Sequence, residues 1–87
     1  MTDLPDIEIR RKRLLWRASR RGMKEMDLLL GGFAQASLPK LDETELRELE
    51  AIVERPDGEL LSWLMGQSPV PPEHRSKTLE ALLRFRP

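Results

Sequence analysis

Apolar residues recur every three or four positions along most of this 87-residue chain, and this spacing decides which folds it can adopt. Residues at that spacing share one face of an α-helix, whose period is about 3.6 residues. The β-branched residues, by contrast, never alternate with polar ones over the length of a strand. The sequence therefore predicts an all-α protein, a compact and irregular bundle of about five short helices.

Cap and turn signals separate the predicted helices. Asp3 or Asp6 can cap the first helix, Asp42 with Glu45 matches a capping box before the third, and Asp57 can cap the fourth. The helices are then expected from around Asp3–Ile7 to Ser19, from about Met23 to Ala36, from Asp42 to about Glu54, from Glu59 to about Gly66, and from Pro72 or Glu73 to Phe85.

Each predicted helix carries an apolar face. Gly31 and Gly32 weaken the second helix by roughly 1 kcal/mol each relative to alanine, so we expect close packing or a local irregularity there. Leu30, Leu49 and Leu64 lie at the centres of three stripes. The residues expected to point inward are Ile7, Ile9, Leu14, Leu15, Trp16 and Ala18; Met23, Met26, Leu28, Leu29, Leu30 and Phe33; Leu46, Leu49, Ile52 and Val53; Leu60, Leu61, Trp63, Leu64 and Met65; and Leu79, Leu82 and Leu83.

Length and composition predict one domain over residues 1–87, with residues 1–5 and 86–87 fraying. The chain has no cysteine, so neither disulfides nor thiolate metal sites can support its core. No apolar run approaches the roughly 20 residues that span a bilayer. Because Met1–Leu4 lacks the apolar core of a signal peptide, we expect a cytoplasmic protein without membrane insertion.

The charges sum to zero but are segregated along the chain. Between Asp42 and Glu59 there are eight acids and only two arginines. Either the basic segment packs near the acidic one, or it presents a basic face to a partner. The basic segment holds eight basic residues and no acid: Arg10, Arg11, Lys12, Arg13, Arg17, Arg20, Arg21 and Lys24.

A glycine surrounded by charges separates the first two predicted helices. Gly22 suits a corner, where it offers either a left-handed backbone or room for another surface to approach. Arg20 and Arg21 would lie in the last turn of one helix and Glu25 in the first turn of the next, each at the end that favours its charge. Helix-end electrostatics explains part of this pattern but does not require so many charges around one glycine.

The corner also carries a family resemblance. The motif Arg21-Gly22-x-x-Glu25, extended to RRGMKEMDLLL, resembles the signature of the small flavinylation factors of succinate dehydrogenase. Trp16, Phe33 and the later Asp57-x-x-Leu60-x-x-Trp63-Leu64-Met65 also match that family's pattern. The resemblance runs from about Ile9 to Phe85.

The resemblance implies a function. Such factors bind the flavoprotein subunit of succinate dehydrogenase, in some bacteria also that of fumarate reductase, and promote covalent attachment of FAD. The bond joins a partner histidine to the flavin and is thought to form autocatalytically, so the factor would hold the partner in a competent conformation. We expect a monomer when free, with no cofactor of its own. Carried over by position, the partner-binding residues are Arg20, Arg21, Gly22, Met23, Lys24, Glu25 and Asp27.

No residue pattern predicts catalysis. His74 is the only histidine and is expected at the surface, and no serine has a histidine at a suggestive spacing. Glu25 and Asp27 diverge on a helix, so they cannot form one acid–base site. We expect neither an enzyme nor a metal site. The alternative function is a small nucleic-acid-binding or regulatory module using the basic segment, but the zero net charge and the two carboxylates at the corner disfavour phosphate binding, so we expect no nucleic-acid partner.

Overall fold

The computed structural model describes residues 6–86, and within that range every regular element is helical. Five helices form if the unbroken run from Lys24 to Ser37 is taken as one, which confirms the all-α prediction. The elements are α1 (Ile7–Ser19), α2 (Lys24–Met26), the π-helical turn η1 (Asp27–Gly31), α3 (Gly32–Ser37), the 3₁₀ turn η2 (Leu38–Lys40), α4 (Glu43–Val53), α5 (Asp57–Leu64), the 3₁₀ turn η3 (Pro72–His74) and α6 (Lys77–Arg84).

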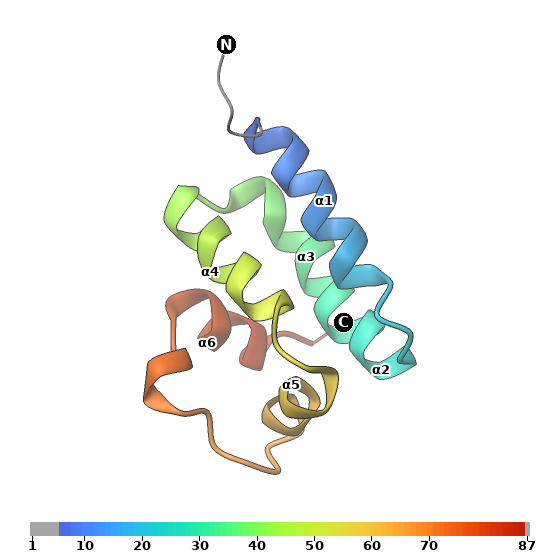
Figure 1. Cartoon of the computed structure of the whole chain (residues 1–87), viewed down its shortest axis with the longest axis vertical. Helices are drawn as coiled ribbons and strands as arrows, with labels where there is room; N and C mark the ends of the chain where they lie inside the picture. Colours follow the sequence, from blue (N-terminus) through green and yellow to red (C-terminus); the bar gives the residue numbers. More distant parts are fainter. Residues whose placement is uncertain (1–5, 87) are drawn as a thin grey trace.

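The helices pack around one apolar core. Figure 1 shows α1 running beside α3 in the opposite direction, with α4 next to them and α5 and α6 at the far end. Helix α1 packs on η1, α3 and α4, while α6 packs on α4 and α5. Ala18 of α1 and Ala34 of α3 are fully buried, and the largest fully buried side chains are Met26, Leu30, Leu46, Leu49, Leu60, Leu79 and Leu82. In the described residues no helix is both long and apolar enough to cross a bilayer.

Local cap signals predicted several helix ends correctly. Asp6 accepts a hydrogen bond from the Glu8 N–H at the start of α1, and Asp42 and Glu45 form the expected capping box. The alternative cap, Asp3, lies outside the described residues, as do all the residues expected to fray (1–5 and 86–87) except Arg86.

Two predicted helix starts are wrong. Helix α5 begins at Asp57 itself, after Pro56, and the Asp57 carboxylate caps no helix N–H because it is bonded to Arg21. The final helix begins at Lys77, not near Pro72: Pro72–His74 forms a separate 3₁₀ turn, and the Ser76 hydroxyl caps α6 by accepting from the Leu79 N–H.

Gly31, the last residue of η1, packs closely against the end of α1. A Cβ on Gly31 would lie 3.1 Å from the Ser19 Cα and 3.4 Å from the Ala18 carbonyl oxygen, so even a methyl group would fit there only if the end of α1 shifted. The helix is also irregular at this point, because η1 winds as a π-helix from Asp27 to Gly31. Both of the alternatives predicted for the glycine pair, close packing and local irregularity, are therefore present.

Several apolar residues expected inside lie at the surface. Ile9 and Trp16 are exposed on α1, Leu28 on η1 and Met65 at the end of α5. Leu64 is also only half-buried, whereas Leu60 and Trp63 fill the core position assigned to it. These errors share a cause: α1, η1 and α5 are each covered on one side only, so an apolar residue outside that side meets solvent.

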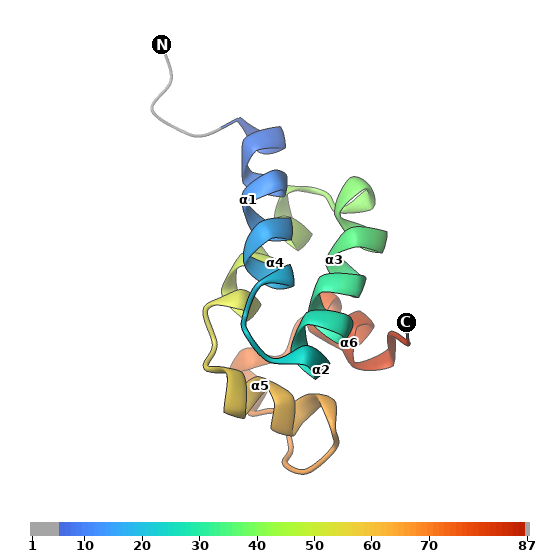
Figure 2. The ribbon, with the colours of Figure 1, turned by 90° about the vertical axis from the view of Figure 1, so that its right-hand side faces the viewer.

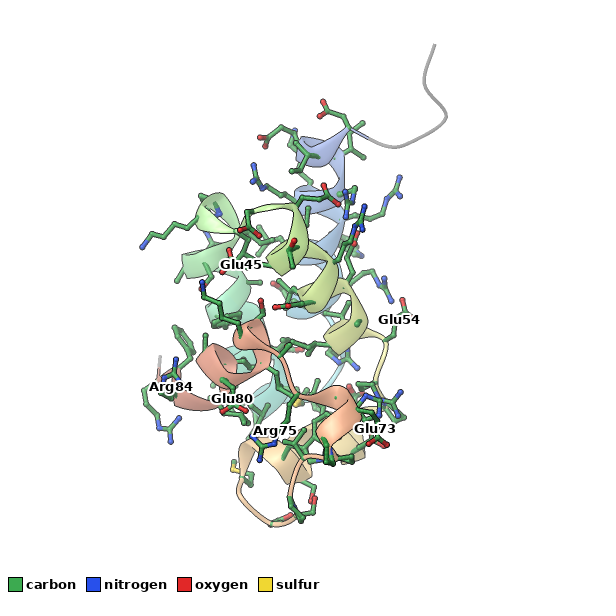
Figure 3. All side chains as sticks on the ribbon, turned by 90° about the vertical axis from the view of Figure 1, so that its left-hand side faces the viewer. Glu45, Glu54, Glu73, Arg75, Glu80 and Arg84 are labelled. Atoms are coloured by element: carbon green, nitrogen blue, oxygen red, sulfur yellow. The ribbon has the colours of Figure 1, made fainter. Side chains whose placement is uncertain are left out.

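The basic and acidic segments pack together, as one of the two interpretations proposed. Arg10 bonds Glu43 at 2.9 Å and Glu50 at 2.8 Å, and Arg17 bonds Glu54 at 2.6 Å. The hydrogen bonds from Arg10 hold the pKa of Glu43 below its ordinary value. Figure 3 shows this acidic side of the molecule, with Glu54 at the end of α4 and Glu45 nearer its start. The segregated charges are therefore used in part to join α1 to α4.

Candidate partner-binding site

The corner between α1 and α2 has the geometry that the glycine predicts. Helix α1 ends at Ser19, Gly22 has a φ of +89°, and α2 begins at Lys24. A φ in that range strains any residue with a Cβ, so the turn requires glycine. A Cβ on Gly22 would meet no atom within 4 Å. Of the two roles predicted for Gly22, the left-handed backbone is present, and the space in front of it is open.

Arg21 points into the molecule, not toward solvent. Its Nη1–H donates to the Val53 carbonyl oxygen at 2.8 Å, its Nη2–H donates to the Arg55 carbonyl oxygen at 2.6 Å, and its Nε–H donates to the Asp57 carboxylate. Only 12% of the side chain is exposed. One guanidinium thus fastens the corner to the α4–α5 turn and satisfies two carbonyl groups, one on the last residue of α4 and one just after the helix.

Asp27 closes the corner from the other side. Its Oδ1 accepts a hydrogen bond from the Arg21 backbone N–H at 2.9 Å, spanning the turn that Gly22 makes. Arg21 is therefore held twice, by its backbone to Asp27 and by its side chain to the α4–α5 turn. The two acids of the motif region lie in different surroundings: Asp27 is half-buried, whereas Glu25 is exposed.

The remaining predicted site residues face solvent or its border. Lys24 and Glu25 are exposed in the first turn of α2, and Met23 is half-buried beside Gly22. Arg20 is exposed, and its Cζ lies 3.7 Å from the centre of the Trp16 ring. The expected position of both arginines in the last turn of α1 is wrong, because the helix ends one residue before Arg20. The outer side of the corner thus presents Arg20, Gly22, Lys24 and Glu25.

A family model described as the flavinator of succinate dehydrogenase matches residues 12–86, which include the whole corner. The chain belongs to this family. It is also 40% identical over 78 residues to the "FAD assembly factor SdhE" of Acetobacter pasteurianus, covering 90% of this chain and 72% of that protein. It is 37% identical over 78 residues to the "Succinate dehydrogenase assembly factor 2, mitochondrial" of Dictyostelium discoideum, covering 90% and 55%, and 30% identical over 81 residues to the protein of that name in Danio rerio, covering 91% and 51%. The chain thus spans only about half the length of these two mitochondrial relatives.

Three residues outside the motif also lie at or beside the corner. Asp57, expected as a helix cap and as a position of the family pattern, is the carboxylate partner of Arg21, 36 positions away in the sequence. Trp16 and Leu28, expected in the core, are 60% and 53% exposed on the helices that meet at the corner. The family pattern was the only sequence signal that Asp57 and Trp16 belong to the site. Asp57 bonds a residue that is distant in the sequence, and the Trp16 side chain is exposed.

One recess of this flavinator-family chain lies away from the corner. Trp63 forms its wall, and His74 packs against the indole with ring centres 5.6 Å apart, so His74 is half-buried and not simply solvated as expected. Nearby, the Arg55 hydrogen bond, helped by the His74 charge, keeps the pKa of Glu59 below its ordinary value. The cavity holds about 140 Å³. Within residues 6–86 no three acidic or histidine side chains converge as metal ligands.

Proposed function

We propose that this chain is an assembly factor that binds the flavoprotein subunit of succinate dehydrogenase and promotes the covalent attachment of FAD to it. The observation that carries the proposal is the family match over residues 12–86. A relative that shares 40% of its aligned residues is named an FAD assembly factor, which supports the same role here. These relatives are named as assembly factors and not as catalysts, so we propose no enzymatic activity.

The geometry of the corner supports a division of the predicted site. Arg21 and Asp27 bond within the molecule and hold the backbone of the turn, so we assign them to shaping the site. Gly22 and Glu25 stand on the outer side with open space before the glycine, so we assign them to partner contact. Arg20, Met23 and Lys24 border the same surface and complete the proposed interface.

This division suggests how binding could act. A left-handed glycine without a side chain lets a partner's surface approach the corner backbone closely. Glu25 adds a carboxylate that can accept hydrogen bonds from a cationic or amide-rich surface on the partner. Binding energy spent on one conformation of the partner shifts its population toward that conformation. The factor would therefore act by holding the flavoprotein in the state in which the bond to FAD forms.

Co-expression with the flavoprotein subunit tests the proposal. Covalent flavin survives denaturing electrophoresis, so the flavoprotein band should fluoresce when this chain is present and remain dark, or nearly so, when it is absent. A pull-down with this chain as bait should recover the same flavin-containing subunit. If flavinylation were equal with and without the chain, and no flavoprotein were captured, the proposed function would be wrong.

We also propose the finer points expected above. The free chain is a monomer, it acts in the cytoplasm, it binds no nucleic acid, and the flavoprotein of fumarate reductase is a second client. The neutral net charge supports the lack of nucleic-acid binding, as do the internal bonds of Arg10, Arg11, Arg17 and Arg21, which use half of the basic segment. Sedimentation, cell fractionation, a filter-binding assay and co-expression with the fumarate reductase subunit test the four points separately.

A further inference from the structure

Two large apolar side chains are exposed on the two elements that the corner joins. Trp16 is 60% exposed near the end of α1, and Leu28 is 53% exposed in η1. Each lies six positions from Gly22, one before it and one after it, on two elements that pack against each other. Single exposed apolar residues are normal on a protein surface. Two on the pair of helices that form one corner, beside the proposed interface, are more informative.

Trp16 and Arg20 are already arranged as a unit. The guanidinium of Arg20 lies over the indole with its Cζ 3.7 Å from the ring centre, which is a cation–π contact. Among the described residues Arg20 forms no ion pair, whereas Arg10, Arg17 and Arg21 each pair with a carboxylate. Stacking fixes the guanidinium and leaves its N–H groups directed past the ring, where they can meet a carboxylate.

The elements place this unit next to the corner's outer side. Figure 2 shows α1 and α3 side by side with the corner at their lower end. Arg20 is both the residue stacked on Trp16 and the first residue of the corner, so the apolar surface and the proposed interface are continuous. Leu28 lies three positions after Glu25 on the same continuous helical run, and both side chains are exposed.

We infer that Trp16 and Leu28 are apolar anchors for the flavoprotein, which takes the indole into an apolar recess and sets a carboxylate against Arg20. The inference rests on the proposed function and names the chemistry of its partner surface. A protein partner fits these groups better than a nucleic acid does, because the exposed Glu25 would repel phosphate while Leu28 would gain nothing from it. Tryptophan and arginine are also the residues most often found to dominate protein–protein binding.

Alanine variants measured against the purified flavoprotein subunit test the anchors. Trp16→Ala should weaken capture by about tenfold or more and Leu28→Ala by a smaller factor, as expected for buried interface anchors. Both variants should keep the circular dichroism spectrum and melting temperature of the parent. Met65→Ala is the matched control: Met65 is 49% exposed but lies at the end of α5, and its loss should leave capture unchanged. For the charge, Arg20→Gln should weaken capture, whereas Arg84→Gln on α6 should not.

Fluorine NMR on the small chain, labelled with fluorotryptophan, reports the contact directly. The chain has two tryptophans, the exposed Trp16 and the buried Trp63, so two signals are expected, and Trp16→Phe assigns them. Adding unlabelled flavoprotein should change the chemical shift of Trp16. The difference between the Trp16 chemical shifts in H₂O and D₂O, which marks exposure to solvent, should then disappear, while the Trp63 chemical shift stays the same.

The possible outcomes separate this inference from the proposed function. If Trp16→Ala captured flavoprotein as the parent does and the Trp16 signal did not move, while Gly22→Arg lost capture, the anchors would be refuted and the function would stand. If the parent captured no flavoprotein, both would fail. A Trp16 signal moved by single-stranded DNA or by anionic phosphatidylglycerol vesicles, and not by flavoprotein, would overturn the inference, as would an equal loss of capture by Met65→Ala.

Discussion

The two sides of the corner use the same kinds of residue for different purposes. On the inner side, Arg21 and Asp27 are tied to neighbouring backbone and to Asp57. On the outer side, Arg20 and Glu25 are exposed and make no bond to each other or to another charged group among the described residues. Each side of the corner thus carries one arginine and one acid, but only the inner pair, Arg21 and Asp27, forms hydrogen bonds that hold the fold.

The difference teaches that a short motif can combine a structural part and a contact part. Arg21 and Glu25 belong to one pattern of five residues, yet the first lies against the α4–α5 turn and the second faces solvent. Loss of function in a variant of either residue would therefore have a different cause. Stability measurements separate the two causes, because removing an inner side chain costs more folding free energy than removing an outer one.

The largest effect is expected on the inner side. Arg21→Ala removes three charge-assisted hydrogen bonds and leaves two backbone carbonyls and Asp57 without their donor. We expect it to lower the free energy of unfolding by roughly 3 kcal/mol, a large part of the stability of a small domain. Urea denaturation measures this, with Arg20→Ala as the matched control, which should lie within about 0.5 kcal/mol of the parent. Equal stability of the two variants would show that the inner and outer arginines do not differ as described.

Glycine substitutions extend the comparison from side chains to the backbone. Gly31→Ala places a methyl group 3.1 Å from the Ser19 Cα, at a point where two helices touch. We expect a loss of about 1–3 kcal/mol, typical of overpacking. Gly58→Ala is the control: its Cβ meets nothing within 4 Å and its φ is not positive, so alanine should be neutral or should stabilise α5 by up to about 1 kcal/mol. A Gly31→Ala protein as stable as Gly58→Ala would contradict the close contact of α1 and η1.

The two acids of the corner give the sharpest matched pair. Asp27→Ala removes the acceptor that closes the turn, so it should cost about 1 kcal/mol. Glu25→Ala removes only a favourable charge near a helix start, worth a few tenths of a kcal/mol, but should weaken capture of the flavoprotein. Thermal melts and pull-downs on both variants check this. The division of roles fails if Asp27→Ala is neutral for stability, or if Glu25→Ala flavinylates its partner as well as the parent does.

Acid should have the smallest effect, and it should act outside the corner. Hydrogen bonds from Arg10 and Arg55 lower the pKa values of Glu43 and Glu59 in the folded chain. Their contribution to stability is therefore complete above the ordinary glutamate pKa of about 4.3 and is lost as the pH falls through the lowered values. Both pairs are partly exposed, so the loss should be modest. Melting temperatures between about pH 6 and pH 3 should fall less steeply in Glu43→Gln than in the parent, and parallel curves would contradict this assignment.

Local sequence rules predicted the helices but not what joins them. The caps at Asp6 and Asp42, the corner at Gly22 and the stripe through Leu46, Leu49 and Val53 all follow from neighbours within a few positions. The link from Arg21 to Asp57 does not, because its partners are 36 residues apart and a helix cap explained Asp57 equally well.

The outer surface was equally hidden from the sequence. Helical spacing puts Trp16 and Leu28 on apolar stripes, and only the placement of neighbouring helices shows that nothing in the described chain covers them. The π-helical winding of η1 also shifts which residues share a face, and no residue type specifies it. The inner and outer sides of the corner could therefore be told apart only in three dimensions.

Gly22 tests the central claim most directly, because its outer side is proposed to receive the partner. Gly22→Asn and Gly22→Arg both place a Cβ at a φ of +89°, but asparagine tolerates a left-handed backbone better and is much smaller. A Cβ at this position meets nothing within 4 Å, so both proteins should fold and remain monodisperse, with losses of about 1–2 kcal/mol that are smaller for asparagine. We predict that Gly22→Asn captures the flavoprotein weakly and that Gly22→Arg captures none and restores no covalent FAD. A folded Gly22→Arg protein that captures and flavinylates its partner like the parent would contradict the placement of the interface at this corner.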